Sequence, residues 1–284
     1  MSETPHTTVE STTLNDGTTL PILGLGTYRL RGRVGAEAVK SAIESGYRLL
    51  DSAYNYENEG SVGAGISAAG VDREDLRVTT KLPGRYHERD QAIVAVEESL
   101  FRAGLDYFDL CLIHWPNPKQ GKYVEAWRAL IELRERGLVR SIGVSNFLTE
   151  HLEKLQQETG VLPSVNQLEI HPWFPQADAI EANQELGIAV EAWSPVGRHS
   201  ALQQEPIVAE VASEVNRSLV QTLLRWHIQR GTIPIPKSAD PQRQRENLNL
   251  FDFALTQEQV DRISSLARSD GRLKGQDPAV YEEF

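Results

Sequence analysis

The chain has 284 residues, of which 40% are hydrophobic, enough for one large α/β domain or two small ones. A formal net charge of −11 and a pI of about 5.2 argue against nucleic acid and anionic membranes as general partners. The single cysteine, Cys111, allows no internal disulfide and no cysteine-based metal cluster. This favours a reducing cytoplasm.

The chain is predicted to form one domain. No apolar run approaches the roughly 18 residues that a membrane span requires. Residues 1–10 lack the basic and apolar regions of a signal peptide and are predicted to form a flexible tail. No linker interrupts the rest, so we expect residues 11–284 to fold as a single unit.

A hairpin is predicted first, over residues 13–20, because Asp16-Gly17 favours a turn with positive φ. Short apolar runs then alternate with helical patterns, which is typical of parallel βα units. Eight strands are predicted, at 22–25, 47–51, 76–80, 107–113, 139–143, 164–169, 188–192 and 232–235. Helices are predicted at 35–45, 58–69, 89–103, 123–136, 149–158, 176–186 and 218–230, with two more at 241–249 and 257–267.

Capping residues support several helix boundaries. Asp90 is predicted to cap the helix at 89–103 and Gly104 to end it. Thr256 and Gln259 predict a capping box at the last helix. The glycines Gly24 and Gly26 predict that the backbone turns tightly as it leaves the first strand.

The fold class follows from the number of strands and from the missing third glycine. A doubly wound sheet with a dinucleotide site would place Gly-x-Gly-x-x-Gly after the first strand, and residues 24–29 (GLGTYR) lack that third glycine. Eight strands alternating with helices instead favour an α/β fold of the (β/α)8 TIM-barrel type.

Four residues with reactive side chains lie at or just after the ends of the second to fourth predicted strands: Asp51, Tyr56, Lys81 and His114. The carboxyl ends of the strands of a barrel converge on one face, where the chemistry takes place. Each residue alone is more often structural, but their joint placement favours an active site. A Lys ammonium lowers the pKa of a nearby Tyr, which can then protonate a carbonyl oxygen. Asp51 would pair with Lys81, and His114 would orient the carbonyl.

Two further sets follow later strands. Ser145, Asn146, Gln167 and Trp193-Ser194-Pro195 offer amides and a flat ring suited to a carboxamide such as nicotinamide. Lys237, Ser238 and Arg243 follow the eighth strand at a helix start, where barrels commonly bind phosphate. Ordinary loop capping, core packing and a solvated helix start remain the structural alternatives for these sets.

These residues resemble those of the aldo-keto reductases, and in particular the bacterial 2,5-diketo-D-gluconic acid reductase type. The matching stretches are 23–27 (LGLGT), 46–48 (GYR), 51–59 (DSAYNYENE), 80–82 (TKL), 112–116 (LIHWP), 140–147 (RSIGVSNF), 165–167 (VNQ), 171–172 (HP), 193–195 (WSP) and 235–238 (IPKS). Their number and order make the resemblance specific, and it covers nearly the whole chain after about residue 10.

The resemblance implies a (β/α)8 barrel whose base is closed by the N-terminal hairpin, with two extra C-terminal helices. It implies reduction of small aldehydes, α-dicarbonyls or keto-sugars such as 2,5-diketo-gluconate by NADPH, in a cytoplasmic monomer without a metal. The family's catalytic tetrad falls on the four reactive residues. Its nicotinamide positions fall on Ser145, Asn146, Gln167 and Trp193, its 2′-phosphate positions on Lys237, Ser238 and Arg243, its adenine positions on Glu246 and Asn247, and its substrate pocket on Tyr28 and Trp115.

The chain also departs from the family pattern. Glu57 stands where Gly usually follows the catalytic Tyr, and Pro83-Gly84-Arg85 replaces the frequent Trp-Asn. Residues 268–284 are polar and carry no recognisable role. Two alternatives stay open: an NADPH-binding sensor with little turnover, and a phosphosugar isomerase or aldolase that uses Lys81 as a Schiff base.

Overall fold

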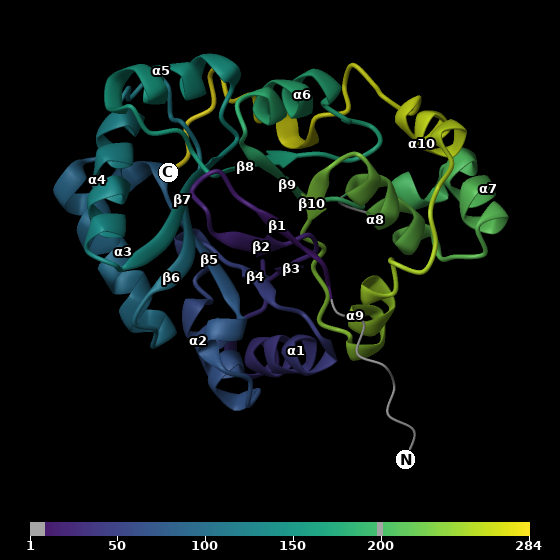
Figure 1. Ribbon diagram of the computed structural model, residues 1–284, viewed down its shortest axis with the longest axis horizontal. Helices are drawn as coiled ribbons and strands as arrows, with labels where there is room; N and C mark the ends of the chain where they lie inside the picture. Colours follow the sequence, from purple (N-terminus) through teal and green to yellow (C-terminus); the bar gives the residue numbers. More distant parts are fainter. Residues whose placement is uncertain (1–8, 198–200) are drawn as a thin grey trace.

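The computed structural model describes residues 9–197 and 201–284, so most of the predicted N-terminal tail lies outside the described residues. Eight parallel strands form one sheet in chain order (Figure 1). They are β3 (Leu25–Gly26), β4 (Leu49–Asp51), β5 (Arg77–Leu82), β6 (Phe108–Ile113), β7 (Val139–Ser145), β8 (Val165–Glu169), β9 (Ala189–Trp193) and β10 (Thr232–Pro234). The eight predicted strands are confirmed, although β3 begins later and is shorter than expected.

The two edges of this sheet meet through backbone hydrogen bonds beside β3 and β10. The Gly24 amide donates to the Pro234 carbonyl at 3.1 Å, and the Gly26 amide donates to the Pro236 carbonyl at 3.0 Å. A Cβ on Gly26 would lie 2.8 Å from the Ile235 carbonyl oxygen, closer than side chains tolerate. The two glycines therefore permit this edge contact, beyond the strand exit predicted for them.

Helices surround the curled sheet (Figure 1). They are α1 (Gly32–Ser45), α2 (Glu59–Ala68), α3 (Arg89–Ala103), α4 (Tyr123–Glu135), α5 (Thr149–Thr159), α6 (Ala177–Glu185), α7 (Pro206–Glu214), α8 (Leu219–Gln229), α9 (Pro241–Leu248) and α10 (Gln257–Ser264). Helix α7 was not predicted from the sequence. Its signals are Pro206 at the first helical position and the buried face formed by Val208 and Val211.

Two of the predicted caps are confirmed and one is wrong. Gly104 ends α3 in the left-handed region at φ 63°, and Thr256 with Gln259 forms the capping box of α10. Asp90 does not cap α3, because the helix begins two residues earlier than a cap at that position requires. Glu88 is the N-cap residue, and Asp90 lies in the first turn, where a carboxylate still favours the positive end of the helix dipole.

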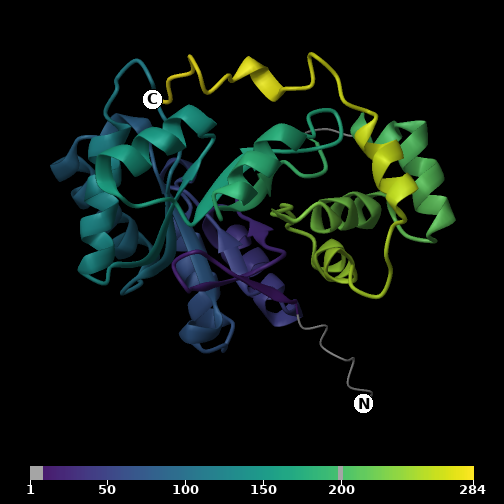
Figure 2. The ribbon, with the colours of Figure 1, turned by 45° about the horizontal axis from the view of Figure 1, so that its top comes forward.

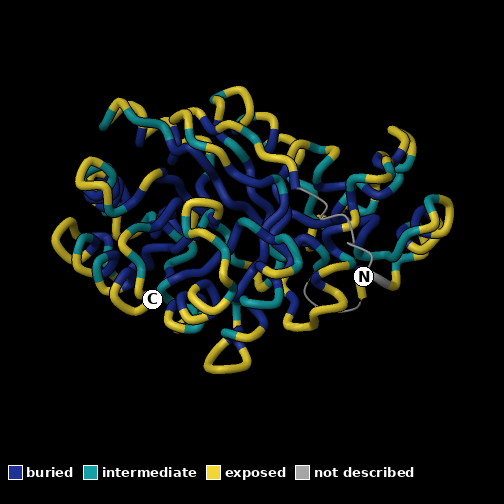
Figure 3. The backbone as a smooth tube through the Cα atoms, turned by 60° about the horizontal axis from the view of Figure 1, so that its bottom comes forward, coloured by how far each residue is buried: buried dark blue, intermediate teal, exposed yellow. Residues whose placement is uncertain are grey.

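The hairpin packs against the sheet through buried leucines. Strands β1 (Ser11–Thr13) and β2 (Thr19–Pro21) pair antiparallel. Leu14 and Leu20 join a buried cluster formed with sheet residues Leu49, Leu110, Leu112, Val165, Ile233 and Ile235. Figure 3 shows the buried residues concentrated in the centre of the molecule. Cys111 on β6 is fully buried, as expected of a small hydrophobic residue.

None of the helices in the described ranges is long and apolar enough to cross a membrane.

Candidate active site

The structure brings the four reactive residues together at the carboxyl ends of β4, β5 and β6. Lys81 is fully buried, and its Nζ lies 2.5 Å from Asp51 Oδ1 and 2.8 Å from the Ser52 carbonyl oxygen. The same Nζ lies 3.4 Å from the hydroxyl of Tyr56, which follows β4 in a 3-10 turn at Tyr54–Tyr56. The ammonium is therefore held between a carboxylate and a phenol.

Burial and charge set the protonation of this group. Burial raises the pKa of Tyr56 and outweighs the lowering effect of the Lys81 ammonium, so the phenol remains protonated at neutral pH. Burial alone would lower the pKa of Lys81, but the adjacent Asp51 carboxylate raises it above its ordinary value. The lysine therefore keeps its charge, and the tyrosine keeps the proton that it could donate.

Two other rings lie close to the Tyr56 ring. The Tyr28 ring meets the Tyr56 ring edge-on at 5.1 Å, and the imidazole of His114 lies 6.1 Å from it, centroid to centroid. Trp115 follows His114 and is buried. The two residues predicted to line a substrate pocket, Tyr28 and Trp115, thus lie beside the reactive residues.

The second predicted set is linked to the reactive residues by hydrogen bonds. The Asn146 side chain donates to the His114 carbonyl at 3.0 Å, and the Trp193 indole donates to Asn146 Oδ1 at 2.9 Å. Gln167 Nε2 donates to Asp51 Oδ1 at 2.9 Å. The Ser145 hydroxyl in turn donates to the Gln167 carbonyl at 2.8 Å. These side chains are therefore fixed in place around the end of the sheet.

Strained backbone accompanies this set. Asn146 has φ 63° and Ser194 has φ 53°, values that side-chain-bearing residues rarely adopt. Glu57, directly after Tyr56, has φ 52°. Left-handed residues of this kind often occur at functional sites, where the surrounding structure holds them. The charge that Glu57 adds is offset by an exposed ion pair with Arg31 at 3.0 Å.

A buried carboxyl that sequence reasoning missed lies behind Gln167. Glu191 is fully buried on β9, and its Oε2 accepts a hydrogen bond from Gln167 Nε2 at 2.8 Å. Its Oε1 has no partner among the described residues. Burial, and then the charge of Asp51, raise the pKa of Glu191 to about 7. An acidic residue within the otherwise apolar run 189–193 (AVEAW) was the available signal.

We expect Glu191→Gln to remove a pH-dependent loss of stability. The folded chain holds the Glu191 proton up to about pH 7, while the unfolded chain releases it near the ordinary value of 4.5. The free energy of unfolding therefore falls as the pH rises between these values, by on the order of 3 kcal/mol at most. Urea unfolding of both proteins at pH values below and above this window measures the difference. Equal pH dependence in both proteins would contradict the assignment.

The third predicted set lies at the start of α9. Lys237 and Arg243 are exposed, Ser238 and Asn247 are buried, and Glu246 is partly exposed. Asp240, which sequence reasoning did not single out, caps α9 by accepting hydrogen bonds from the amides of residues 242 and 243 at 2.8 and 3.1 Å. The helix amides are thus already engaged, which leaves the side chains of the set for a phosphate.

The C-terminal strap, which we define as residues 268–284, reaches the reactive residues. Figure 2 shows it running from α10 across the molecule to the side of α5. Near its end, Glu283 Oε1 lies 2.7 Å from His114 Nδ1. Burial alone would raise the pKa of Glu283, but the contacts with His114, the Gly84 amide and Asn55 lower it. No sequence motif pointed to this contact.

The strap is anchored at several points. The Leu273 amide donates to Glu169 at 2.7 Å, and the Tyr281 ring packs on Trp115 at 4.5 Å. The side chain of Asn117 bonds to both backbone groups of Glu283, at 2.8 and 3.1 Å. The strap thus covers part of the region around His114 and Trp115.

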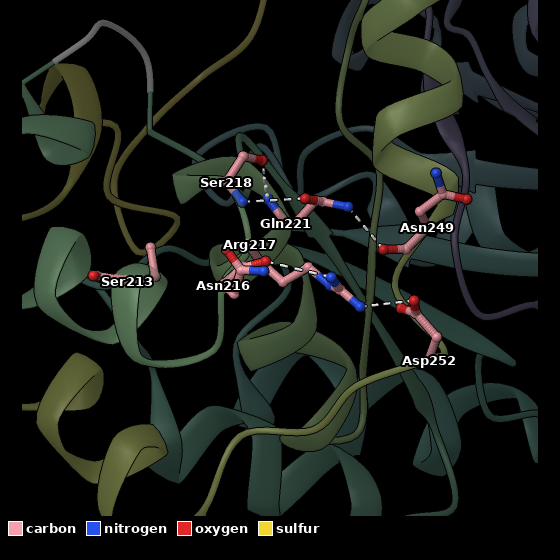
Figure 4. Close-up of a pocket in the computed structure, with 8 residues that line it drawn as sticks. Ser213, Asn216, Arg217, Ser218, Gln221, Asn249 and Asp252 are labelled. Atoms are coloured by element: carbon pink, nitrogen blue, oxygen red, sulfur yellow. Dashed lines mark hydrogen bonds and ion pairs between the residues drawn. The ribbon is translucent and has the colours of Figure 1, made fainter.

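A separate surface pocket lies between α7, α8 and the segment after α9 (Figure 4). There Arg217 pairs with Asp252 at 2.7 Å, and Gln221 donates to the Asn249 carbonyl at 2.9 Å. None of the predicted site residues lines this pocket. We therefore do not consider it a candidate for the chemistry.

The family model, the similar sequences and the similar structures all point to the same family. The model of the "Aldo/keto reductase family" matches residues 23–268. The chain is 53% identical to 2,5-diketo-D-gluconic acid reductase B of Corynebacterium sp., over 97% of this chain and 99% of that protein. An aldo-keto reductase of Bombyx mori in complex with NADP superposes with a TM-score of 0.88 at 39% identity, covering 97% and 98% of the two chains. A mutant of Gox0644 in complex with NADPH gives 0.91 at 40% identity, covering 96% and 99%.

Proposed function

The chain belongs to the aldo/keto reductase family, and from this premise we propose that the four reactive residues of the candidate active site are its catalytic residues. The protein is an NADPH-dependent oxidoreductase that reduces aldehydes and ketones to alcohols. The observation that carries the catalytic assignment is the buried Lys81 ammonium, which contacts both the Asp51 carboxylate and the Tyr56 hydroxyl.

Each residue has a role that follows from its contacts. Bound NADPH supplies the hydride that the carbonyl carbon receives. Tyr56 donates its phenolic proton to the carbonyl oxygen, which completes the alcohol. Lys81 stabilises the phenolate left behind, and Asp51 holds Lys81 in place. His114, whose ring lies 6.1 Å from the Tyr56 ring, contacts the same oxygen and orients the carbonyl near Tyr28 and Trp115.

The cofactor residues are proposed from the same contacts. The amides of Asn146 and Gln167, with the Ser145 hydroxyl, suit the donors and acceptors of a carboxamide. The half-buried Trp193 is fixed through its indole nitrogen and offers its ring to the nicotinamide, with Ser194 and Pro195 following it. Lys237, Ser238 and Arg243 are proposed to bind the 2′-phosphate, and Glu246 and Asn247 to lie near the adenine.

We also propose a closed (β/α)8 barrel, with the hairpin closing its base and α9 and α10 as additional helices. The hydrogen bonds between the sheet edges and the buried leucines of the hairpin support this arrangement. The single cysteine supports a cytoplasmic location, and the negative charge argues against nucleic acid as a partner. Membership of the family, whose model matches residues 23–268, supports a monomer of one domain.

Turnover across a substrate panel tests the proposal. We expect NADPH to be oxidised with small aldehydes, α-dicarbonyls such as methylglyoxal and phenylglyoxal, and 2,5-diketo-gluconate. The loss of NADPH absorbance measures the rates and ranks the substrates. Tight binding of NADPH, seen by fluorescence, without turnover of any panel member would instead favour a sensor of the reduced cofactor.

A further inference from the structure

We propose that Glu283 is a positioning residue of the reduction, which keeps a proton on His114 Nδ1 and leaves Nε2 to face the substrate oxygen. This inference rests on the proposed function, because it assumes that His114 meets the carbonyl. It adds a residue from the C-terminal strap to a site otherwise built from strand ends.

Two hydrogen bonds and the close contact with His114 surround the Glu283 carboxylate. Oε1 accepts from Asn55 Nδ2 at 2.8 Å and lies 2.7 Å from His114 Nδ1, while Oε2 accepts from the Gly84 amide at 3.1 Å. The Glu283 side chain is only 9% exposed. A carboxylate accepts at both oxygens, whereas a neutral amide would turn its NH2 group toward one of the donors. The surroundings therefore specify a charged carboxylate.

The same contact fixes the proton of His114. Two unprotonated acceptor atoms would repel each other at 2.7 Å, so Nδ1 must carry a proton. The N–H direction does not satisfy hydrogen-bond geometry, so Glu283 acts mainly through its charge. The carboxylate thereby occupies the Nδ1 side of the imidazole ring. Nε2, the other ring nitrogen, is then the one left to face a carbonyl oxygen.

Glu283 is held in place without help from His114. Asn117, at φ 45°, bonds to the amide and the carbonyl of Glu283. A Cβ on Gly84 would lie 2.1 Å from Asn117 Nδ2, so the glycine leaves room for this arrangement. The departure from the family pattern at 83–85 therefore coincides with the place where the strap is anchored.

Other ionisable groups near the pair do not replace Glu283. The Tyr56 ring lies 6.1 Å from the imidazole of His114, centroid to centroid, and Tyr56 in turn contacts Lys81, which pairs with Asp51. His87, close to Glu283, is buried, and burial lowers its pKa to about 4, so it is neutral at neutral pH. The exposed Arg85 donates to Asn55 Oδ1.

The test compares Glu283→Gln with Glu282→Gln. Glu282 is the neighbouring carboxylate of the strap and accepts a hydrogen bond from the Lys119 amide at 2.7 Å, away from His114. We expect Glu283→Gln to lower kcat for phenylglyoxal by about tenfold or more. The dissociation constant for NADPH and the midpoint of thermal unfolding should stay near those of the wild type. Glu282→Gln should retain wild-type kcat.

Nitrogen-15 NMR of the histidines supplies a readout that a purely structural role would not change. The wild type should show a protonated Nδ1 at His114, identified by its loss in His114→Asn, and Glu283→Gln should alter that signal. An unprotonated Nδ1 in the wild type, or equal kcat in wild type and Glu283→Gln, would overturn the proposal. A rise in kcat in Glu283→Gln would also overturn it, because the strap would then obstruct the site. Absence of all carbonyl reduction in the wild type would instead refute the proposed function, while the NMR signal would still report on Glu283.

Discussion

Tyr56→Phe is expected to lower kcat for carbonyl reduction by about a thousandfold while NADPH still binds. The substitution removes only the hydroxyl, and with it the proton that the carbonyl oxygen must receive. The ring that packs edge-on against Tyr28 is kept. Lys81 keeps its bonds to Asp51 and to the Ser52 carbonyl, so no buried charge loses its main partner. Steady-state rates with phenylglyoxal and NADPH fluorescence titrations measure the two effects separately.

Tyr54→Phe is the matched control for this substitution. Tyr54 belongs to the same 3-10 turn, but its ring packs on Tyr86 and lies under Arg102, away from Lys81. It should retain most of the wild-type rate. Equal turnover in Tyr56→Phe and wild type would show that another group protonates the oxygen.

Arg243→Ala is expected to weaken NADPH binding by about tenfold to a hundredfold while leaving NADH binding nearly unchanged. A charge-assisted hydrogen bond contributes about 1.5–3 kcal/mol, and only NADPH carries the 2′-phosphate that Arg243 would contact. Because Asp240 already accepts from the first amides of α9, the helix start offers little else to that phosphate. Dissociation constants for both cofactors, measured by fluorescence, test the expectation.

Arg245→Ala serves as the control, because it removes an equally exposed guanidinium two residues further along α9. This substitution should lower the affinities for NADPH and NADH only slightly and by similar factors. An equal loss of NADPH and NADH affinity in Arg243→Ala would mean that Arg243 does not bind the 2′-phosphate.

The strand ends were predictable because they follow local patterns. Apolar runs that end in Asp51, Lys81 and His114 can be read directly from the sequence, and the parallel sheet places those ends side by side.

The structure also argues against the alternative in which Lys81 forms a Schiff base. Its raised pKa and its ion pair with Asp51 keep the amine protonated, whereas a Schiff base requires the neutral form.

The remaining features depend on long-range packing that local patterns do not contain. The contact of Glu283 with His114 requires the strap to cross the molecule, and nothing in its polar sequence indicates a path. Glu191 could be noticed as an acid in an apolar strand, but its bond to Gln167 depends on the pairing of β8 with β9. Asp90 shows the opposite case, since the true N-cap, Glu88, lies only two residues earlier, and that small difference changes the role of Asp90.

The anchoring of the strap has a consequence for how activity relates to folding. The bond between Asn117 and Glu283 joins positions 166 residues apart in the chain, while the strap itself contains only a short 3-10 turn at Leu273–Gly275. Such a segment opens with a smaller free energy than the sheet beneath it and forms late, after distant parts of the chain have met. On our proposal for Glu283, the concentration of competent enzyme is therefore set by the local opening equilibrium of the strap, and inactivation precedes global unfolding.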